Sequence, residues 1–136
     1  MEKMALAPGL EGKASFKVEA RHLAPALGSG EARVLSTPSL VAGMEAAAMQ
    51  AVHTCLEEHQ TTVGIHIDIQ HNAGTPLGML VTFDATLPEV KGRKLYFAVK
   101  ASDECGAVGE GTHERMIVSI EQFEAKINAK RINCSG

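Results

Sequence analysis

One long apolar segment followed by four alternating segments limits the possible folds more than any other feature of this chain. Residues 36–59, "STPSLVAGMEAAAMQAVHTCLEEH", are rich in alanine and methionine and predict a helix. The next segments have the two-residue period of strands: "TTVGIHIDIQH", "PLGMLVTFDATL", "RKLYFAVKAS" and "AVGEGTHERMIVS". Their separators, residues 72–76, 88–92 and 103–106, are short and turn-like, which favours antiparallel neighbours.

The segment before the helix completes the expected layout. Residues 13–20 alternate and predict a first strand, and residues 25–38 form a turn-rich loop long enough to be a lid or binding loop. Thr37 is expected to cap the helix, with Pro38 at its first position, and the helix should run to about His59. These elements predict an α+β fold in which a first strand and a four-stranded antiparallel meander wrap around a long central helix.

Composition restricts the domain count and the classes of partner. The 136 residues contain no repeat or long linker, so one domain, 1–136, is expected. A net charge of −3, one tyrosine and no tryptophan argue against nucleic-acid binding and favour a small-molecule or protein partner. Three widely spaced cysteines predict free thiols. With no signal-peptide core and no run of about 18 apolar residues, a cytoplasmic location without a membrane span is expected.

Glu45 is a carboxylate in the apolar half of the predicted helix. Its neighbours at helical spacing are uncharged: Val41, Ala48, Met49 and Val52. An unpaired carboxylate in an apolar setting costs several kcal/mol, so such a residue tends to be paired, protonated or functional. The alternative is that the helix has one solvent-exposed edge and that Glu45 lies on this edge.

Thr37 and His71 can carry chemistry beside Glu45. Thr37 lies eight residues before Glu45, at the start of the predicted helix, and N-capping alone is enough to explain a threonine there. The free amides at a helix start can also hold an oxyanion, so a second role is open to Thr37. Two-residue periodicity places His71 on one face of its strand, facing the helix, together with Val63, Ile65, Ile67 and Ile69. It is then either a partly buried, hydrogen-bonded histidine or a group for proton transfer.

Three other features of the strands bear on a site. His66 and Asp68 have the opposite parity to His71, which argues against a metal site, and no metal or organic cofactor is expected. Gly64 interrupts a β-branched strand, where a backbone often approaches another group. Arg115 alternates in phase with Ile117 and either turns inward toward a carboxylate or ligand oxygen, or remains solvated.

Together these segments resemble the hot-dog-fold acyl-CoA thioesterases, and most closely the fluoroacetyl-CoA thioesterase family. The resemblance spans about residues 14–127 and depends on "TPSLVAGMEAAAM", "VGIHIDIQHNAGTPLGM" and "HERMIVSIEQFEAKI". It implies a homodimer, possibly a higher homo-oligomer, with active sites at the subunit boundary and an acyl-CoA substrate. It also implies catalytic roles for Thr37, Glu45 and His71, and an acyl site partly lined by Gly64 and Arg115.

The loop before the helix departs from the family pattern. The fluoroacetyl-specific enzyme carries a phenylalanine lid there, whereas this chain reads "LGSGEARVLS", so a broader or different acyl group is expected. In the implied reaction Glu45 is the nucleophile or the general base for water. Thr37 positions or activates the attacking group and helps to polarise the thioester carbonyl, and His71 transfers the proton, for instance to the departing thiolate. The alternatives are a non-catalytic acyl-CoA-binding regulator, an acyl-CoA hydratase or dehydratase, and a purely structural dimer module.

Overall fold

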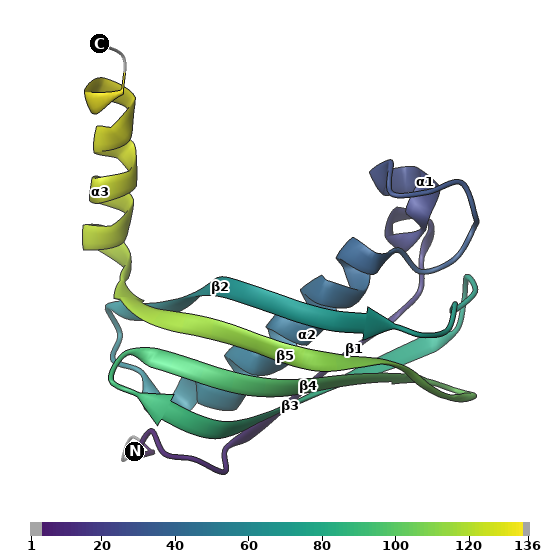
Figure 1. Ribbon diagram of the computed structural model, residues 1–136, viewed down its shortest axis with the longest axis horizontal. Helices are drawn as coiled ribbons and strands as arrows, with labels where there is room; N and C mark the ends of the chain where they lie inside the picture. The colour runs from purple at the N-terminus through teal and green to yellow at the C-terminus, as the bar shows by residue number, and fades with distance from the viewer. Residues whose placement is uncertain (1–3, 135–136) are drawn as a thin grey trace.

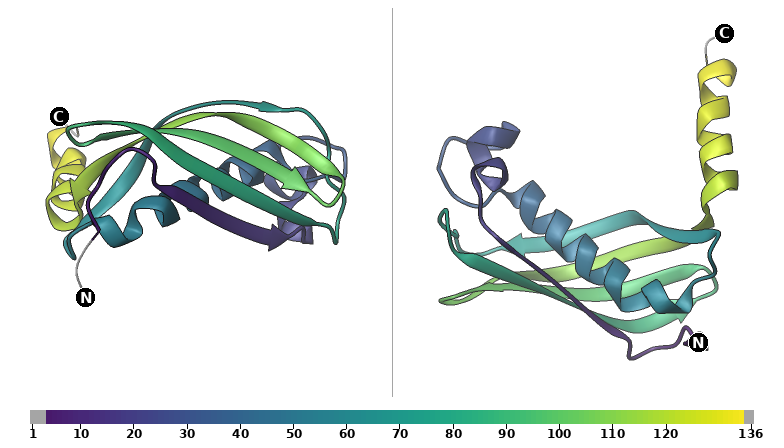
Figure 2. Two further views of the ribbon diagram at one scale, coloured as in Figure 1. Left: turned by 90° about the horizontal axis from the view of Figure 1, so that it is seen from below. Right: turned by 180° about the vertical axis from the view of Figure 1, so that it is seen from behind.

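A long helix lies against the concave face of a single antiparallel sheet (Figures 1 and 2). The computed structural model describes residues 4–134, so the ends of the predicted domain, residues 1–3 and 135–136, lie outside the described residues. The helix is α2, Thr37–Val52. The five strands are β1 Glu11–Lys17, β2 Gln60–His71, β3 Leu80–Lys91, β4 Lys94–Asp103 and β5 Gly106–Ser119. The predicted α+β fold, with the sheet wrapped around the helix, is confirmed.

The strand order is β1-β3-β4-β5-β2, which corrects the expected four-stranded meander. Only β3, β4 and β5 follow one another as neighbours. β2 pairs with β5 and forms the far edge of the sheet, three strand positions from β3. Three strand spacings are about 14 Å, a distance that the link between His71 and Leu80 spans easily although it is short. Link length therefore indicated antiparallel strands without fixing which strands are neighbours.

The start of α2 differs from the prediction by one residue, and its end by more. Ser36, and not Thr37, is the N-cap, because its hydroxyl accepts the Ser39 backbone N–H at 3.1 Å. Thr37 is the first helical residue. The α-helix ends at Val52 and not near His59, and a 3-10 turn, His53–Cys55, follows it. Thr and Cys are weaker helix formers than the alanines before them, and the chain must turn here to enter β2.

The core fills the space between α2 and the three central strands. Its largest fully buried apolar side chains come from α2, from the loop before it and from strands β3 and β4: Leu35, Leu40, Met44, Phe83, Leu87, Leu95 and Phe97. Gly12 of β1 passes so close to the helix that an added Cβ would collide with the backbone of Ala47 and Ala51. This contact brings β1 against one side of α2, while β2 lies along the other side of the sheet.

Two peripheral helices flank this body. The predicted loop 25–38 contains a short helix α1, Ala24–Leu27, preceded by a 3-10 turn, Ala20–His22, and the loop is closed by a bridge between Leu23 and Leu35. Helix α3, Ile120–Asn133, extends away from the sheet and buries none of its residues (Figure 1). Within residues 4–134, no helix has the length and apolar character that a membrane crossing requires.

Candidate active site

A bulge in β2 determines which of its side chains face α2. Gly64 pairs with Arg115, and the next paired residue, His66, lies opposite Glu114, so Ile65 is the additional residue. Residues directly opposite in a sheet share a face. Gly64 is therefore on the helix side, and so is Ile67, which pairs with His113. The expected common face of Val63, Ile65, Ile67, Ile69 and His71 is wrong for Val63, because the bulge shifts the alternation by one residue.

Glu45 projects from the edge of α2 toward β5, where Arg115 binds it. Arg115 Nη1 donates to Glu45 Oε2 at 3.1 Å. The Glu45 side chain is 40% exposed, whereas that of Arg115 is 5% exposed. Both sequence interpretations of Glu45 are thus partly right, because Glu45 lies on a solvent-exposed edge of the helix and is also paired with Arg115. For Arg115 the inward orientation is confirmed.

Arg115 uses almost all of its donors within the protein. Its Nε donates to Thr62 Oγ1 at 2.8 Å, and its Nη2 donates to the Thr62 carbonyl at 2.9 Å. Its Nη1 also lies 3.1 Å from His113 Nε2. Burial lowers the pKa of Arg115, and Glu45 acts in the opposite direction by Coulomb attraction and hydrogen bonding. The guanidinium remains charged near neutral pH and is oriented by three residues.

The carboxylate of Glu45 forms part of the wall of a hollow of about 310 Å³, here called the Glu45 hollow, lined by Val41, Glu45, Gly64, Ile65, His66, Ile67 and His113. Gly64 lies directly beneath the acid: a Cβ there would be 2.7 Å from Glu45 Oε2 and 3.2 Å from His113 Cε1. This confirms the expected close approach at Gly64. No other hydrogen bond to Glu45 occurs within residues 4–134, which leaves Oε1 free to act on a ligand.

Thr37 and His71 form a second group at the N-terminal end of α2. Thr37 Oγ1 and His71 Nδ1 are 2.8 Å apart, and the buried His71 Nε2 has no hydrogen-bond partner among residues 4–134. Burial lowers the pKa of His71, an effect that a backbone contact with Ala73 partly offsets. The pair lies in a hollow of about 360 Å³, the lid hollow, between the loop 29–36 and residues 72–74. The orphaned nitrogen is suited to bind or protonate a ligand atom.

The amides at the start of α2 are fewer than a helix start usually offers. The N–H of Ser39 is taken by the Ser36 hydroxyl, and that of Leu40 by the Ser36 carbonyl. Pro38 has no N–H. Within the described residues this leaves the N–H of Thr37, next to its own hydroxyl, as the free helix-terminal donor for an oxyanion.

The predicted catalytic residues thus fall into two groups within one chain. Thr37 contacts His71, whereas Glu45 contacts Arg115. Eight residues separate Thr37 from Glu45 on α2, a rise of about 12 Å along the helix axis. Within residues 4–134 of one chain, no hydrogen bond joins the two groups.

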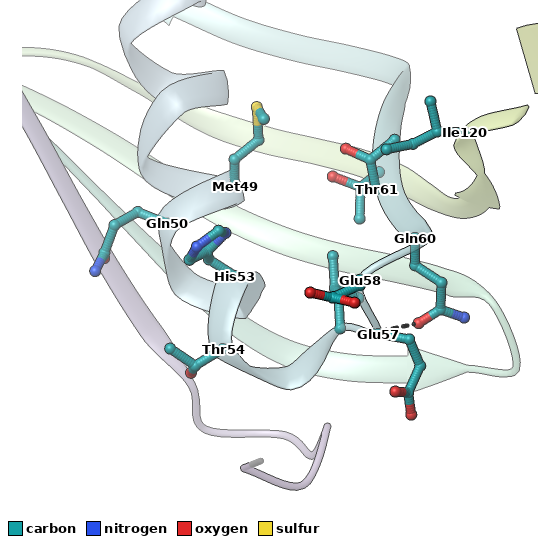
Figure 3. Close-up of a pocket in the computed structure, with 11 residues that line it drawn as sticks. Met49, Gln50, His53, Thr54, Glu57, Glu58, Gln60, Thr61 and Ile120 are labelled. Atoms are coloured by element: carbon teal, nitrogen blue, oxygen red, sulfur yellow. Dashed lines mark hydrogen bonds between the residues drawn. The ribbon is translucent and has the colours of Figure 1, made fainter. Parts of the chain in front are cut away.

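A larger hollow, about 650 Å³, lies farther along α2 and is lined by none of the predicted site residues (Figure 3). It lies between the end of α2 and the start of β2, and Met49 and Ile120 contribute its apolar groups. Among the residues that line it, the Glu57 N–H donates to Gln60 Oε1 at 3.0 Å. Met49 is one helical turn beyond Glu45, so this hollow and the Glu45 hollow lie at successive turns of α2.

His66 and Asp68 lie on the opposite face of β2 from His71. Both lie on the outer face of β2, where the His66 ring is 3.6 Å from Glu114. Residues 4–134 contain no cluster of three or more His, Cys, Asp or Glu side chains that could hold a metal ion. The sequence analysis did not identify Thr62, which binds Arg115 twice, or His113. His113 lies two positions before Arg115 on β5 and therefore shares its inward phase.

An antiparallel sheet wrapped around a long helix is the hot-dog fold, which this chain shares with structures of the thioesterase superfamily. A Thermus thermophilus member of that superfamily has the same fold, with a TM-score of 0.84 at 24% identity over 93% of this chain and 94% of that one. A hot-dog-like protein from Thermanaerovibrio acidaminovorans gives a TM-score of 0.81 at 26% identity, covering 92% and 93% of the two chains.

The chain belongs to the fluoroacetyl-CoA-specific thioesterase family, whose sequence model matches residues 18–121. It is 39% identical over 97 residues to the fluoroacetyl-CoA thioesterase of Streptantibioticus cattleyicolor. These 97 residues make up 71% of this chain and 70% of that protein. The structure of the fluoroacetyl-CoA thioesterase FlK matches with a TM-score of 0.88 at 32% identity, over 93% of this chain and 98% of that one. The predicted family and the predicted enzyme class, an acyl-CoA thioesterase, are confirmed.

Proposed function

We propose that this thioesterase hydrolyses short acyl-CoA thioesters with Glu45, Thr37 and His71 as its catalytic residues. Water and the thioester give a free acid and the thiol of coenzyme A. The observation that carries the proposal is Glu45, whose Oε2 is held by Arg115 while its Oε1 is free at the wall of the Glu45 hollow. A carboxylate held in this way can attack the thioester carbonyl or take a proton from an attacking water. The reaction as written requires no cofactor beyond the coenzyme A of its substrate.

Thr37 and His71 supply the remaining steps in this proposal. The Thr37 N–H polarises the carbonyl oxygen, the Thr37 hydroxyl orients the His71 ring, and His71 Nε2 delivers a proton to the departing thiolate. Support comes from the unpartnered Nε2 and from the 2.8 Å contact that holds the other ring nitrogen. A proton on Nε2 is available because Nδ1 can accept the Thr37 hydroxyl proton.

The two groups work together when two copies of the chain associate. We propose a homodimer formed through the β2 edge, in which Glu45 of one copy acts beside the Thr37 and His71 pair of the other. β2 is one of the two edge strands, and Ile65 and Ile67 on it are 44% and 39% exposed. A free edge with exposed apolar side chains favours pairing with another strand. Larger homo-oligomers could form from such dimers.

The lid residues favour a broader substrate range than fluoroacetyl-CoA alone. The loop 29–36, which lines the lid hollow, contains no aromatic residue, and Leu27 at the end of α1 is 44% exposed. Small and flexible residues beside Thr37 leave room for acyl groups other than fluoroacetyl. A cytoplasmic site of action fits the three unbridged cysteines found within residues 4–134.

A thiol-release assay tests this function. Acetyl-, fluoroacetyl-, propionyl-, butyryl- and malonyl-CoA should be compared at equal concentrations, with free thiol measured over time. We expect hydrolysis of several short acyl groups, with no large preference for fluoroacetyl-CoA. Turnover of fluoroacetyl-CoA alone would contradict the proposed breadth. Saturable binding without thiol release would indicate an acyl-CoA-binding regulator instead, and hydration of crotonyl-CoA would indicate a hydratase.

A further inference from the structure

We infer that His113 is a positioning residue for Glu45, which it holds in place through Arg115. The inference deepens the proposed function, because it assigns a role to a buried group that the thioesterase mechanism above does not use. His113 lies on β5, is 2% exposed and has its ring 3.1 Å from Arg115 Nη1.

The hydrogen bonds of His113 fix its tautomer. Nδ1 is 2.8 Å from the backbone carbonyl oxygen of His66, which can only accept, so Nδ1 carries the proton. In the neutral ring Nε2 then has a lone pair, and it accepts a proton from Arg115 Nη1. Burial is the main cause of the lowered pKa of His113, which favours this neutral form.

The acceptor on His113 determines where Arg115 directs its second Nη1 proton. A guanidinium is planar, so a proton on Nη1 that bonds to His113 forces the other proton on the same nitrogen to point elsewhere in the plane. That second proton donates to Glu45 Oε2. Thr62 holds the opposite side of the group through Nε and Nη2. Removal of the His113 acceptor would free one side of the guanidinium to rotate away from Glu45.

His113 is poorly placed to act directly on the carboxylate. Its Nε2 is 4.0 Å from Glu45 Oε2, which is beyond hydrogen-bond distance. The titratable groups that act electrostatically on the ring are Glu45 from α2, Arg115 from β5 and, from the outer face of β2, His66. A proton on Nε2 would abolish the acceptor and place a second cation beside Arg115. The neutral ring therefore acts on Glu45 through the arginine.

Two substitutions separate the two bonds of the ring. His113→Asn retains an amide N–H near the position of Nδ1 for the His66 carbonyl, but its side chain is too short to reach Arg115. His113→Gln extends far enough to place its amide oxygen near the position of Nε2, where it can accept from Arg115. Phe97→Leu is the packing control, because the Phe97 ring stacks on His113 with centroids 6.3 Å apart and has no polar contact with Arg115.

We expect His113→Asn to lower kcat about 10- to 100-fold with little change in KM, because the catalytic acid is misplaced and the substrate is still bound. His113→Gln should restore most of the lost kcat. Phe97→Leu should lower the melting temperature and leave kcat near that of the unaltered protein. An unchanged kcat in His113→Asn, no rescue in His113→Gln, or an equal loss of kcat in Phe97→Leu would overturn the inference.

A second readout is independent of turnover. NMR spectra of ¹⁵N-labelled protein should show slow rotation and slow hydrogen exchange of the Arg115 guanidinium in the unaltered chain and in His113→Gln, and faster rotation in His113→Asn. If the unaltered protein released no thiol, the proposed function would fail while these spectra still tested the positioning contact. Equal guanidinium rotation in all three proteins would refute the contact itself.

Discussion

Glu45 and Arg115 form an ion pair whose two ends differ sharply in exposure: the guanidinium is buried and the carboxylate opens onto a hollow. Such a pair adds little to stability, because the cost of burying the arginine offsets much of the attraction. Its more useful effect is directional. A fixed cation orients one carboxylate oxygen and leaves the other exposed to ligand, which is the arrangement that a nucleophile or base requires.

Glu45→Gln should abolish most turnover while preserving the fold. Glutamine keeps an oxygen for Arg115 but has no negative charge, so we expect kcat to fall about 100- to 10,000-fold. Thiol release and thermal melting should be measured together. Glu110→Gln, an exposed substitution on the same strand as Arg115, is the matched control. Glu45 would be removed from the mechanism if Glu45→Gln kept its rate.

Mixed dimers should recover activity if each site combines two copies. A chain carrying Glu45→Gln and one carrying His71→Ala are each expected to be inactive alone. When they are unfolded and refolded together, half of the dimers are mixed, and each mixed dimer has one site with both groups intact, which gives about 25% of the original activity. A mixture that stays inactive although mixed dimers form would place both groups of a site in one chain.

Thr37 and His71 should behave as one unit. We expect Thr37→Ala to lower kcat about 10-fold or more and His71→Ala to lower it further, with a double variant no worse than His71→Ala. Thr37→Ser keeps the hydroxyl and should retain most activity. Kinetics of all four variants, with melting curves, give the coupling between the two residues. Strictly multiplicative losses would show that the 2.8 Å contact has no catalytic role.

Gly64→Ala should impair the reaction through Glu45. The new methyl group would be 2.7 Å from Glu45 Oε2, and the carboxylate is the flexible neighbour that must move. We expect a lower kcat and a small change in melting temperature, together with a displaced Glu45 in a crystal structure of the variant. A variant with full activity and an unmoved carboxylate would contradict this assignment of Gly64.

Acid should destabilise the protein below about pH 6.5. His22, His71 and His113 each have a pKa lowered from 6.5, mainly by burial. Between the lowered pKa and 6.5 the unfolded chain binds more protons than the folded chain, so the free energy of unfolding falls as the pH drops through this range. Melting temperatures from pH 8 to pH 5 should be level above pH 7.5 and then decline. His113→Gln should show a smaller decline, and a curve that is flat to pH 5 would refute this account.

The periodic pattern of the sequence predicted the elements well because each buries one face. The helix and the strands follow from spacing, whereas for Arg115 spacing left an inward and a solvated position open. The pairing of β2 with β5 could not be predicted, because the link after His71 is compatible with either side of the sheet. The cap was assigned to Thr37 although Ser36 is an equally good capping residue one position earlier.

The site was harder to predict than the fold because it depends on contacts between distant strands. Glu45 stood out because no charged residue is near it along the helix, but its partner is 70 residues away. The bulge at Ile65 left no clear mark in a segment of alternating β-branched residues. His113 looked like an ordinary strand residue, since nothing in the sequence reveals that its ring nitrogen faces Arg115.

The additional residue in β2 also determines how this strand tolerates changes in length. Loss of the codon for Ile65 would convert the bulge into a regular ladder and leave Gly64 and His71 both facing the helix. Loss of one codon between His66 and His71 would turn His71 to the outer surface, away from Thr37, if the bulge were kept. If the bulge closed instead, His71 would keep its face, but the residues between Gly64 and the deletion would change theirs. A deletion at position 65 is therefore the one that preserves the face of every other residue in this part of the strand.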